Sequence, residues 1–148
     1  PCRCTQKEIA RYLGRISGPL LDRIDMQLEV TAVPVRQITE SAPEEPSADI
    51  HKRVQAARER QQKRYAGEGI SCNAELSARQ LETFCPLDDA CRELLGKACD
   101  TYHLSMSAVS RVRKVARTIA DLAGAEEIGR AHLLEALRYR NLEGNYWK

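Results

Sequence analysis

The chain has 148 residues, of which 43% are hydrophobic and 30% are charged, with a formal net charge of +2. This composition is typical of a folded protein with one hydrophobic core, and it excludes a disordered tail. The charge is too small to indicate nucleic-acid binding by itself, and no apolar run is long enough to cross a membrane. No secretory signal is recognisable, so we expect a cytoplasmic protein, and the opening PCRCT indicates a piece of a longer one.

Residues 1–46 are predicted to hold two short elements and a linker. Residues 5–24 predict one short helix, a glycine turn and a further helical or loop segment. Residues 25–33 alternate apolar and polar side chains, which predicts a half-buried strand. Its apolar positions are Met26, Leu28, Val30 and Ala32. One strand has no sheet partner here, so we expect residues 1–46 to be poorly ordered or loosely packed in the isolated chain. The stretch ESAPEEPSAD at 40–49 predicts a linker.

Residues 47–148 are predicted to form a helical bundle, because apolar side chains recur at helical spacing along each segment. The expected helices span residues 47–65, 77–84, 87–102, 106–123 and 130–140. Ser47 is the expected N-cap of the first helix. The inner stripe of that helix is Ile50, Val54, Ala57, Gln61 and Tyr65, and its exposed side carries Lys52, Arg53, Arg60, Lys63 and Arg64. The fourth helix is expected to carry Arg111, Arg113, Lys114 and Arg117 outside its core stripe.

The six cysteines are expected to be reduced thiols, given the long helical patterns and the missing secretory signal. Cys85, Cys91 and Cys99 lie in or beside apolar helical segments and are predicted to pack as small hydrophobes. Cys2 and Cys4 form a C-x-C pair, which supplies half of a zinc site at most. The three histidines lack the spacing of a metal or catalytic site, so no bound metal is predicted.

The stretch SGPLLDRID, residues 17–25, places Arg23 between Asp22 and Asp25 and beside an apolar patch. One interpretation is a helix end, with the two carboxylates holding the guanidinium and the leucines buried. The other is an arginine that reaches a phosphate on another subunit. The residues of this stretch alone leave both interpretations open.

Four stretches in order, RYLGRISGPLLDRID, RVQAARERQ, RKVARTIADL and AHLLEALRYR, resemble the C-terminal part of the magnesium-chelatase-like AAA+ ATPases, in the ComM- or YifB-like branch. The resemblance covers nearly the whole chain. It implies a mainly α fold, the C-terminal helical lid bundle (47–148), preceded by a small remnant of the α/β ATPase core (1–46). The family's Walker A and Walker B residues lie upstream, and no G-x-x-x-x-G-K-[ST] is present, so this chain alone is not expected to hydrolyse ATP.

The resemblance also implies roles for individual residues. Arg23 matches the arginine finger, which projects into the ATP site of the next subunit, and Asp22 and Asp25 are expected to orient it while no neighbour is present. Relatives carry leucine-serine-x-arginine at the start of the fourth helix, where the arginine senses nucleotide. Here the stretch is LSMSAVSR, so Ser107 holds the sensor position, and Arg111, one turn later, either senses nucleotide or makes only a surface ion pair.

For the whole protein, the resemblance implies a homo-oligomeric ring, expected to be a hexamer, that uses ATP and Mg²⁺ to remodel DNA as a branch-migration helicase does. Two alternatives stay open. One is a magnesium-chelatase motor that acts on a protein partner during porphyrin metalation, and the other is a lid that serves only as an interaction module. A zinc site built on the cysteine pair of residues 2 and 4 is a further implication for the longer protein. The isolated chain is expected to hold no cofactor.

Overall fold

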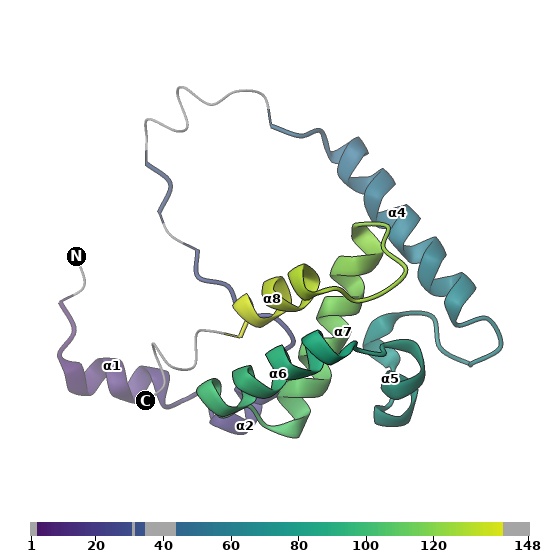
Figure 1. Cartoon of the computed structure of the whole chain (residues 1–148). Coiled ribbons are helices and arrows are strands. Elements are labelled where there is room, and N and C mark those ends of the chain that lie inside the picture. Colours follow the sequence, from purple (N-terminus) through teal and green to yellow (C-terminus); the bar gives the residue numbers. More distant parts are fainter. Residues whose placement is uncertain (1–2, 31, 35–43, 141–148) are drawn as a thin grey trace.

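The structure of the chain, a computed structural model, describes residues 3–30, 32–34 and 44–140 (Figure 1). Within these ranges it contains helices and no strand. The helices are α1 (Gln6–Leu13), α2 (Gly18–Asp22), α4 (Ser47–Arg64), α5 (Ala78–Phe84), α6 (Asp89–Tyr102), α7 (Met106–Leu122) and α8 (Arg130–Arg138), with a 3₁₀ helix at Asn73–Glu75. The mainly α fold predicted from the sequence is confirmed.

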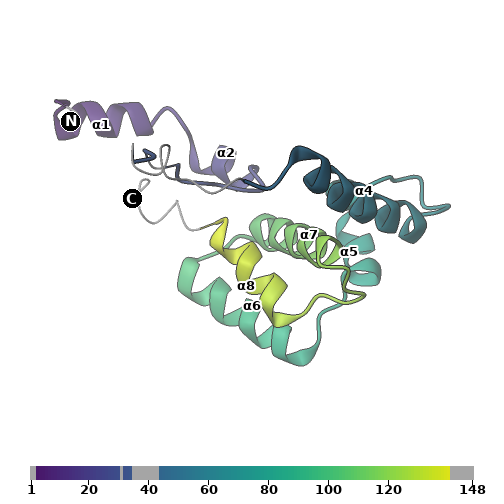
Figure 2. The same cartoon turned by 90° about the horizontal axis from the view of Figure 1, so that it is seen from above.

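Helix α7 is the centre of the bundle. It packs most extensively against α8 and also contacts α4 and α5, while α6 packs on α8. Figure 2 shows α4 and α6 on opposite sides of α7. The core joins side chains from all of these helices, and Leu81, Cys91, Val112 and Leu133 are at most 2% exposed. Removing this much apolar surface from water is the main force that holds the bundle together.

Side-chain caps set where three of the helices begin. Ser77, Asp88 and Ser105 each accept a hydrogen bond from the amide three residues later, at 3.3, 2.7 and 3.1 Å. These bonds satisfy N–H groups that have no partner within the helix. The prediction that Ser47 caps α4 is wrong, because Pro46 occupies the N-cap position without a side-chain bond and Ser47 is the first helical residue.

The predicted stripe of α4 is confirmed only in its second half. Ala57, Gln61 and Tyr65 are buried against the bundle, whereas Ile50 and Val54 stay exposed. The ring of Tyr65 meets the ring of Phe84 edge-on, with centroids 5.2 Å apart. The C-terminal half of α4 is therefore the part that belongs to the core.

The predicted strand at 25–33 is not formed in the described part of that segment, 25–30 and 32–33. The positions expected to face the core are exposed, with Val30 at 90%, whereas Gln27 is buried at 7%. The amide of Gln27 donates to the carbonyl oxygen of Tyr139 (2.8 Å), and its side-chain Nε2 donates to Leu21 O (3.4 Å). A strand needs a neighbouring strand to pair with, and the described residues place none beside this segment, whose Gln27 amide instead bonds to the backbone just after α8.

Candidate functional site

Arg23 lies on the turn that follows α2. Its amide donates to Leu20 O (3.0 Å), which closes the last turn of this short helix. Leu21, on the preceding turn, is buried at 4% exposure, and its carbonyl oxygen accepts hydrogen bonds from Gln27 and Arg140. The Arg23 side chain is exposed, and it makes no hydrogen bond or ion pair with any other residue that the structure describes. The turn therefore presents an exposed cation that pairs with none of the residues in the described part of the chain.

The carboxylates of Asp22 and Asp25 face the helical bundle and not Arg23. Ser105, the N-cap of α7, donates its hydroxyl to Asp22 Oδ2 (2.8 Å). Arg111, on the first turns of α7, forms an ion pair with Asp25. The expectation that both aspartates orient Arg23 is thus wrong in this structure, because the lid supplies donors to them from the start of α7 and the end of α8.

Arg140, just after α8, holds the backbone on both sides of Arg23. Its Nη1 donates to Ile24 O (2.5 Å) and to Leu21 O (3.4 Å), and its Nη2 pairs with Asp22 Oδ1 (3.2 Å). The Arg140 side chain is only 2% exposed. Sequence reasoning missed this residue. It falls at the last position of the predicted helix 130–140, and nothing in the local pattern separates it from the exposed Arg138 two positions earlier.

Arg111 is brought to the turn that carries the candidate finger, and Ser107 is not. The Arg111 side chain is 27% exposed and that of Asp25 45%, so their ion pair is partly shielded from water. Ser107 is exposed on the first turn of α7. The ion pair is one of the two roles considered for Arg111, and nucleotide sensing by this residue stays a prediction.

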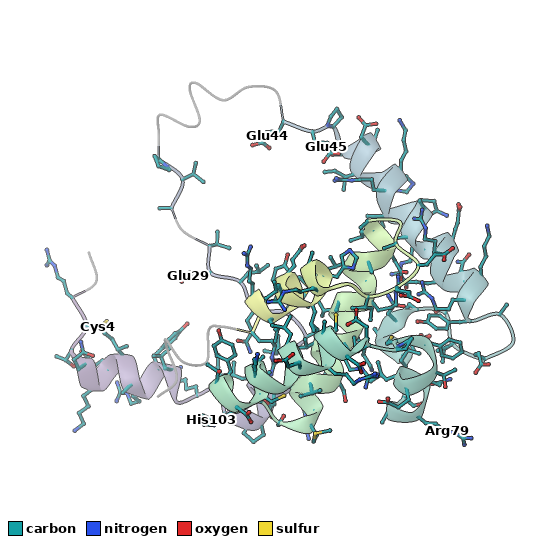
Figure 3. All side chains as sticks on the ribbon, in the orientation of Figure 1. Cys4, Glu29, Glu44, Glu45, Arg79 and His103 are labelled. Atoms are coloured by element: carbon teal, nitrogen blue, oxygen red, sulfur yellow. The ribbon has the colours of Figure 1, made fainter. Side chains whose placement is uncertain are left out.

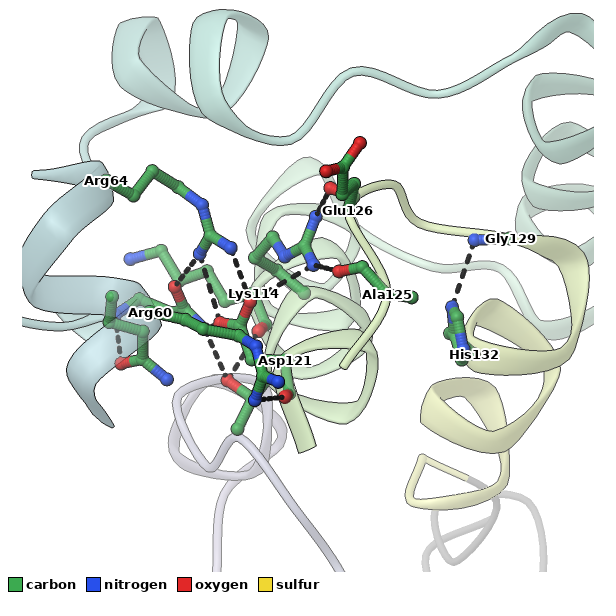
Figure 4. A network of polar contacts seen from close by, with 12 residues as sticks. Arg60, Arg64, Lys114, Asp121, Ala125, Glu126, Gly129 and His132 are labelled. Carbon is green, nitrogen blue, oxygen red and sulfur yellow. Dashed lines mark hydrogen bonds and ion pairs between the residues drawn. The ribbon is translucent and has the colours of Figure 1, made fainter. Parts of the chain in front are cut away.

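A second polar cluster is buried between α4 and α7 (Figure 4). Asp121, in the last turn of α7, is fully buried and pairs with Arg64 and, at 3.0 Å, with Arg117. Asn73 Nδ2 donates to the same carboxylate at 2.9 Å. Burial favours the neutral acid, but the hydrogen bonds from Arg64 and Asn73 outweigh it and hold the pKa of Asp121 below its usual value. The cluster ties α4 and the 3₁₀ helix to α7.

The prediction that Arg117 lies outside the core is wrong. Its side chain is 2% exposed, and its two terminal nitrogens donate to Glu126 O and Ala125 O, both at 2.7 Å. Arg64, expected on the exposed side of α4, also turns inward. These arginines bridge α4, α7 and the loop before α8, so part of the basic face predicted for α4 is used inside the molecule.

The cysteines of the bundle pack as predicted. Cys85 and Cys91 are fully buried, and burial raises the pKa of each thiol to about 11. Cys4 is exposed beside α1 (Figure 3), and Cys2 lies outside the described residues. Among the described residues, no three histidine, cysteine or acidic side chains are grouped as metal ligands. None of the described helices has the length and apolar character needed to cross a membrane.

Comparison with known proteins matches the chain in two parts. Residues 44–140 match the family "Magnesium chelatase, subunit ChlI C-terminal", and residues 1–38 match "Magnesium chelatase, subunit ChlI". The turn that carries Arg23 thus belongs to one match, and the residues of α7 and α8 that contact this turn belong to the other.

Similar proteins are known from several bacteria. The chain is 41% identical to the protein YifB of Salmonella typhimurium over 95% of this chain and 27% of that protein. It is 41% identical to the competence protein ComM of Haemophilus influenzae over 93% of this chain and 26% of that protein. It is 34% identical to an uncharacterized protein of Mycobacterium tuberculosis over 94% of this chain and 27% of that protein. The chain therefore spans about a quarter of the length of the curated relatives it matches.

Proposed function

The chain belongs to the magnesium-chelatase-like family, in its ComM- and YifB-like branch, and from this premise we propose that it is the lid and finger region of a longer ATPase. The longer protein would assemble into a homo-oligomeric ring, with six subunits as the expected number. ATP and Mg²⁺ would bind to upstream residues that this chain does not contain. The chain alone would not turn over ATP.

One observation carries the proposal: Arg23 is exposed on a held turn and is paired with no described residue. Charge spreads over the γ-phosphoryl oxygens during ATP hydrolysis, and a guanidinium is a permanently charged planar donor that neutralises this charge without proton transfer. A finger supplied by a neighbouring subunit is worth about 10³–10⁵ in turnover. Arg23 has the exposure that such a role requires, and no residue within the described ranges occupies its donors.

Arg111 is the proposed contact from the lid to the nucleotide of its own subunit. It lies on α7, partly exposed, and its present partner Asp25 is a carboxylate, which a phosphate could replace as an acceptor of the same charge sign. Ser107, by contrast, has a short side chain without a positive charge. The lid would then close over nucleotide through a residue one turn away from the position that relatives use.

DNA is the proposed substrate of the motor, as a branch-migration helicase that extends heteroduplex DNA. The support is the similarity to a protein named for competence. The alternative, a motor that acts on a protein partner in porphyrin metalation, is supported by the family description, which names magnesium chelatase. A shared motor fold does not decide between these substrates.

ATPase and gel-shift assays on the longer protein test the proposal. We expect ATP turnover that forked DNA stimulates, and forked DNA that shifts more strongly with ATP than without. Arg23→Ala should lower kcat by about 10³-fold with nucleotide binding retained. Arg15→Ala, a change at an exposed arginine in the same segment, is the matched control and should leave kcat unchanged.

The outcomes separate the alternatives. ATP turnover that forked DNA does not stimulate, together with no gel shift of forked DNA, contradicts the helicase proposal and favours a protein partner. Full turnover in Arg23→Ala contradicts the finger assignment whatever the substrate is.

A further inference from the structure

The end of α8 and the turn that carries Arg23 are joined by a set of polar contacts far apart in sequence. Arg140 donates to the carbonyl oxygens of Leu21 and Ile24, which lie two residues before and one residue after Arg23. The carbonyl oxygen of Tyr139 accepts the amide of Gln27 at 2.8 Å. The backbone is therefore held by residues of the lid both before and after Arg23.

We propose that Arg140 is a positioning residue for Arg23: through the backbone of residues 21–24, the lid of one subunit aims the finger that this subunit offers to its neighbour. The inference rests on the proposed function, because it concerns how the proposed finger, Arg23, is positioned. Arg140 would touch neither nucleotide nor the reacting atoms and would act only through Arg23.

The geometry requires an arginine at this place. A buried cation is costly unless it is paired, and at 2% exposure the two terminal nitrogens of Arg140 meet acceptors within the turn. Its planar fork reaches two carbonyl oxygens from one nitrogen and the Asp22 carboxylate from the other. A lysine carries the charge as a single point and could not hold these acceptors in one fixed plane.

Two further contacts keep the turn against the lid. Ser105 donates to Asp22 Oδ2 (2.8 Å), so the carboxylate that pairs with Arg140 is also tied to the start of α7. Arg111 pairs with Asp25 on the other side of Arg23. A movement of α7 and α8 is therefore transmitted to the turn, and the position of the finger depends on the state of the lid in its own subunit.

A double-mutant comparison of ATP turnover in the longer protein tests this inference. Arg140→Ala should lower kcat by about 10- to 100-fold, the effect of misplacing a catalytic group by about 1 Å, with KM for ATP unchanged. In the Arg23→Ala background, Arg140→Ala should change kcat less than about 2-fold, because its effect passes through Arg23. Arg140→Lys should give a partial loss, and Arg138→Ala, at the exposed arginine of the same helix end, should give none.

Equal losses from Arg140→Ala in both backgrounds would mean a general structural role and would overturn the inference, as would an unchanged kcat in the wild-type background. These results leave the finger assignment intact, because Arg23→Ala is measured in the same series. If Arg23→Ala has full turnover, the proposed function fails and the inference fails with it.

Limited proteolysis of this chain tests how firmly the Arg23 turn is held and needs no ATPase assay. Trypsin cleaves after arginine only where the backbone is free to open. We expect Arg140→Ala to raise cleavage after Arg23 by about 10-fold relative to cleavage after Arg15, and Arg138→Ala to leave that ratio unchanged. An unchanged ratio in Arg140→Ala would show that the lid does not hold the turn.

Discussion

The bundle of residues 44–140 and the segment of residues 3–30 differ in how they use their side chains. The bundle buries a continuous apolar cluster and even encloses the guanidinium of Arg117. The segment leaves Tyr12, Leu28 and Val30 largely exposed and is attached mainly through Leu21, Gln27 and the contacts of Arg140. One region completes its own core, while the other is held by a few contacts and leaves large apolar side chains exposed.

Amide exchange should show the largest difference between the two regions. Core amides of α7 exchange only when the bundle opens, which slows them by several orders of magnitude. In the segment, Gln27 should be protected by its bond to Tyr139 O, whereas Met26 and Val30 should exchange almost freely. Hydrogen–deuterium exchange followed by NMR measures this. Strong protection at Met26 and Val30 in the monomeric chain would contradict the comparison.

Breaking the buried cluster should cost the bundle much of its stability. Asp121→Ala leaves Arg64 and Arg117 without their carboxylate, and removing one partner of a buried ion pair typically costs about 3–5 kcal/mol. Chemical denaturation gives the change in the free energy of unfolding. Asp49→Ala, which breaks an exposed pair with Lys52 on α4, is the control and should cost about 0–1 kcal/mol. Similar losses from both variants would contradict a stabilising role of the buried cluster.

Acid should weaken the bundle through the same carboxylate. The pKa of Asp121 is lower in the folded chain than in the unfolded chain, so the unfolded chain takes up the proton first as the pH falls. The stabilisation is complete well above the ordinary aspartate pKa of about 4 and is lost as the pH falls through the lower folded value. Denaturation between pH 7 and pH 3 should give a steeper decline for the wild type than for Asp121→Asn, by at most about 1.4 kcal/mol per pH unit. Parallel declines would assign the acid sensitivity to other groups.

The ion pair between Arg111 and Asp25 should have the smallest effect on stability. Because both side chains are partly exposed, Arg111→Ala should change the free energy of unfolding by about 0–1 kcal/mol. In the longer protein it should nevertheless lower ATP turnover, since we propose that Arg111 contacts nucleotide. Thermal unfolding and ATPase assays on Arg111→Ala and Ser107→Arg separate the two roles. If Ser107→Arg raises turnover while Arg111→Ala leaves it unchanged, Arg111 does not replace the usual sensor.

The helices could be predicted because their signals are local. Apolar spacing lies within a few residues of the element it defines, and the structure confirms α5 to α8 close to their expected bounds. The strand at 25–33 could not be predicted correctly in the same way. Its alternation is a local pattern, but pairing requires a second strand, and the described residues offer none.

The site residues followed the same rule. Arg23 could be proposed from the stretch around it together with the family resemblance, and its role stays a prediction. The directions of long side chains could not, because Arg117 turns inward toward the carbonyl groups of a loop, and Arg140 turns toward a segment more than 100 positions earlier in the chain. Local sequence gives the position of an arginine along a helix, but its distant acceptors decide where the guanidinium lies.

Mixed rings of the longer protein give the most direct test of the claim that Arg23 acts on a neighbouring subunit. One subunit carries Arg23→Ala and keeps its own ATP site, and the other carries an inactivated Walker A lysine and keeps Arg23. Each ring of a single variant should be inactive, whereas mixed rings shown to assemble should recover turnover, because the Walker A variant supplies Arg23 to the intact site beside it. Assembled mixed rings without any recovered turnover would contradict the account.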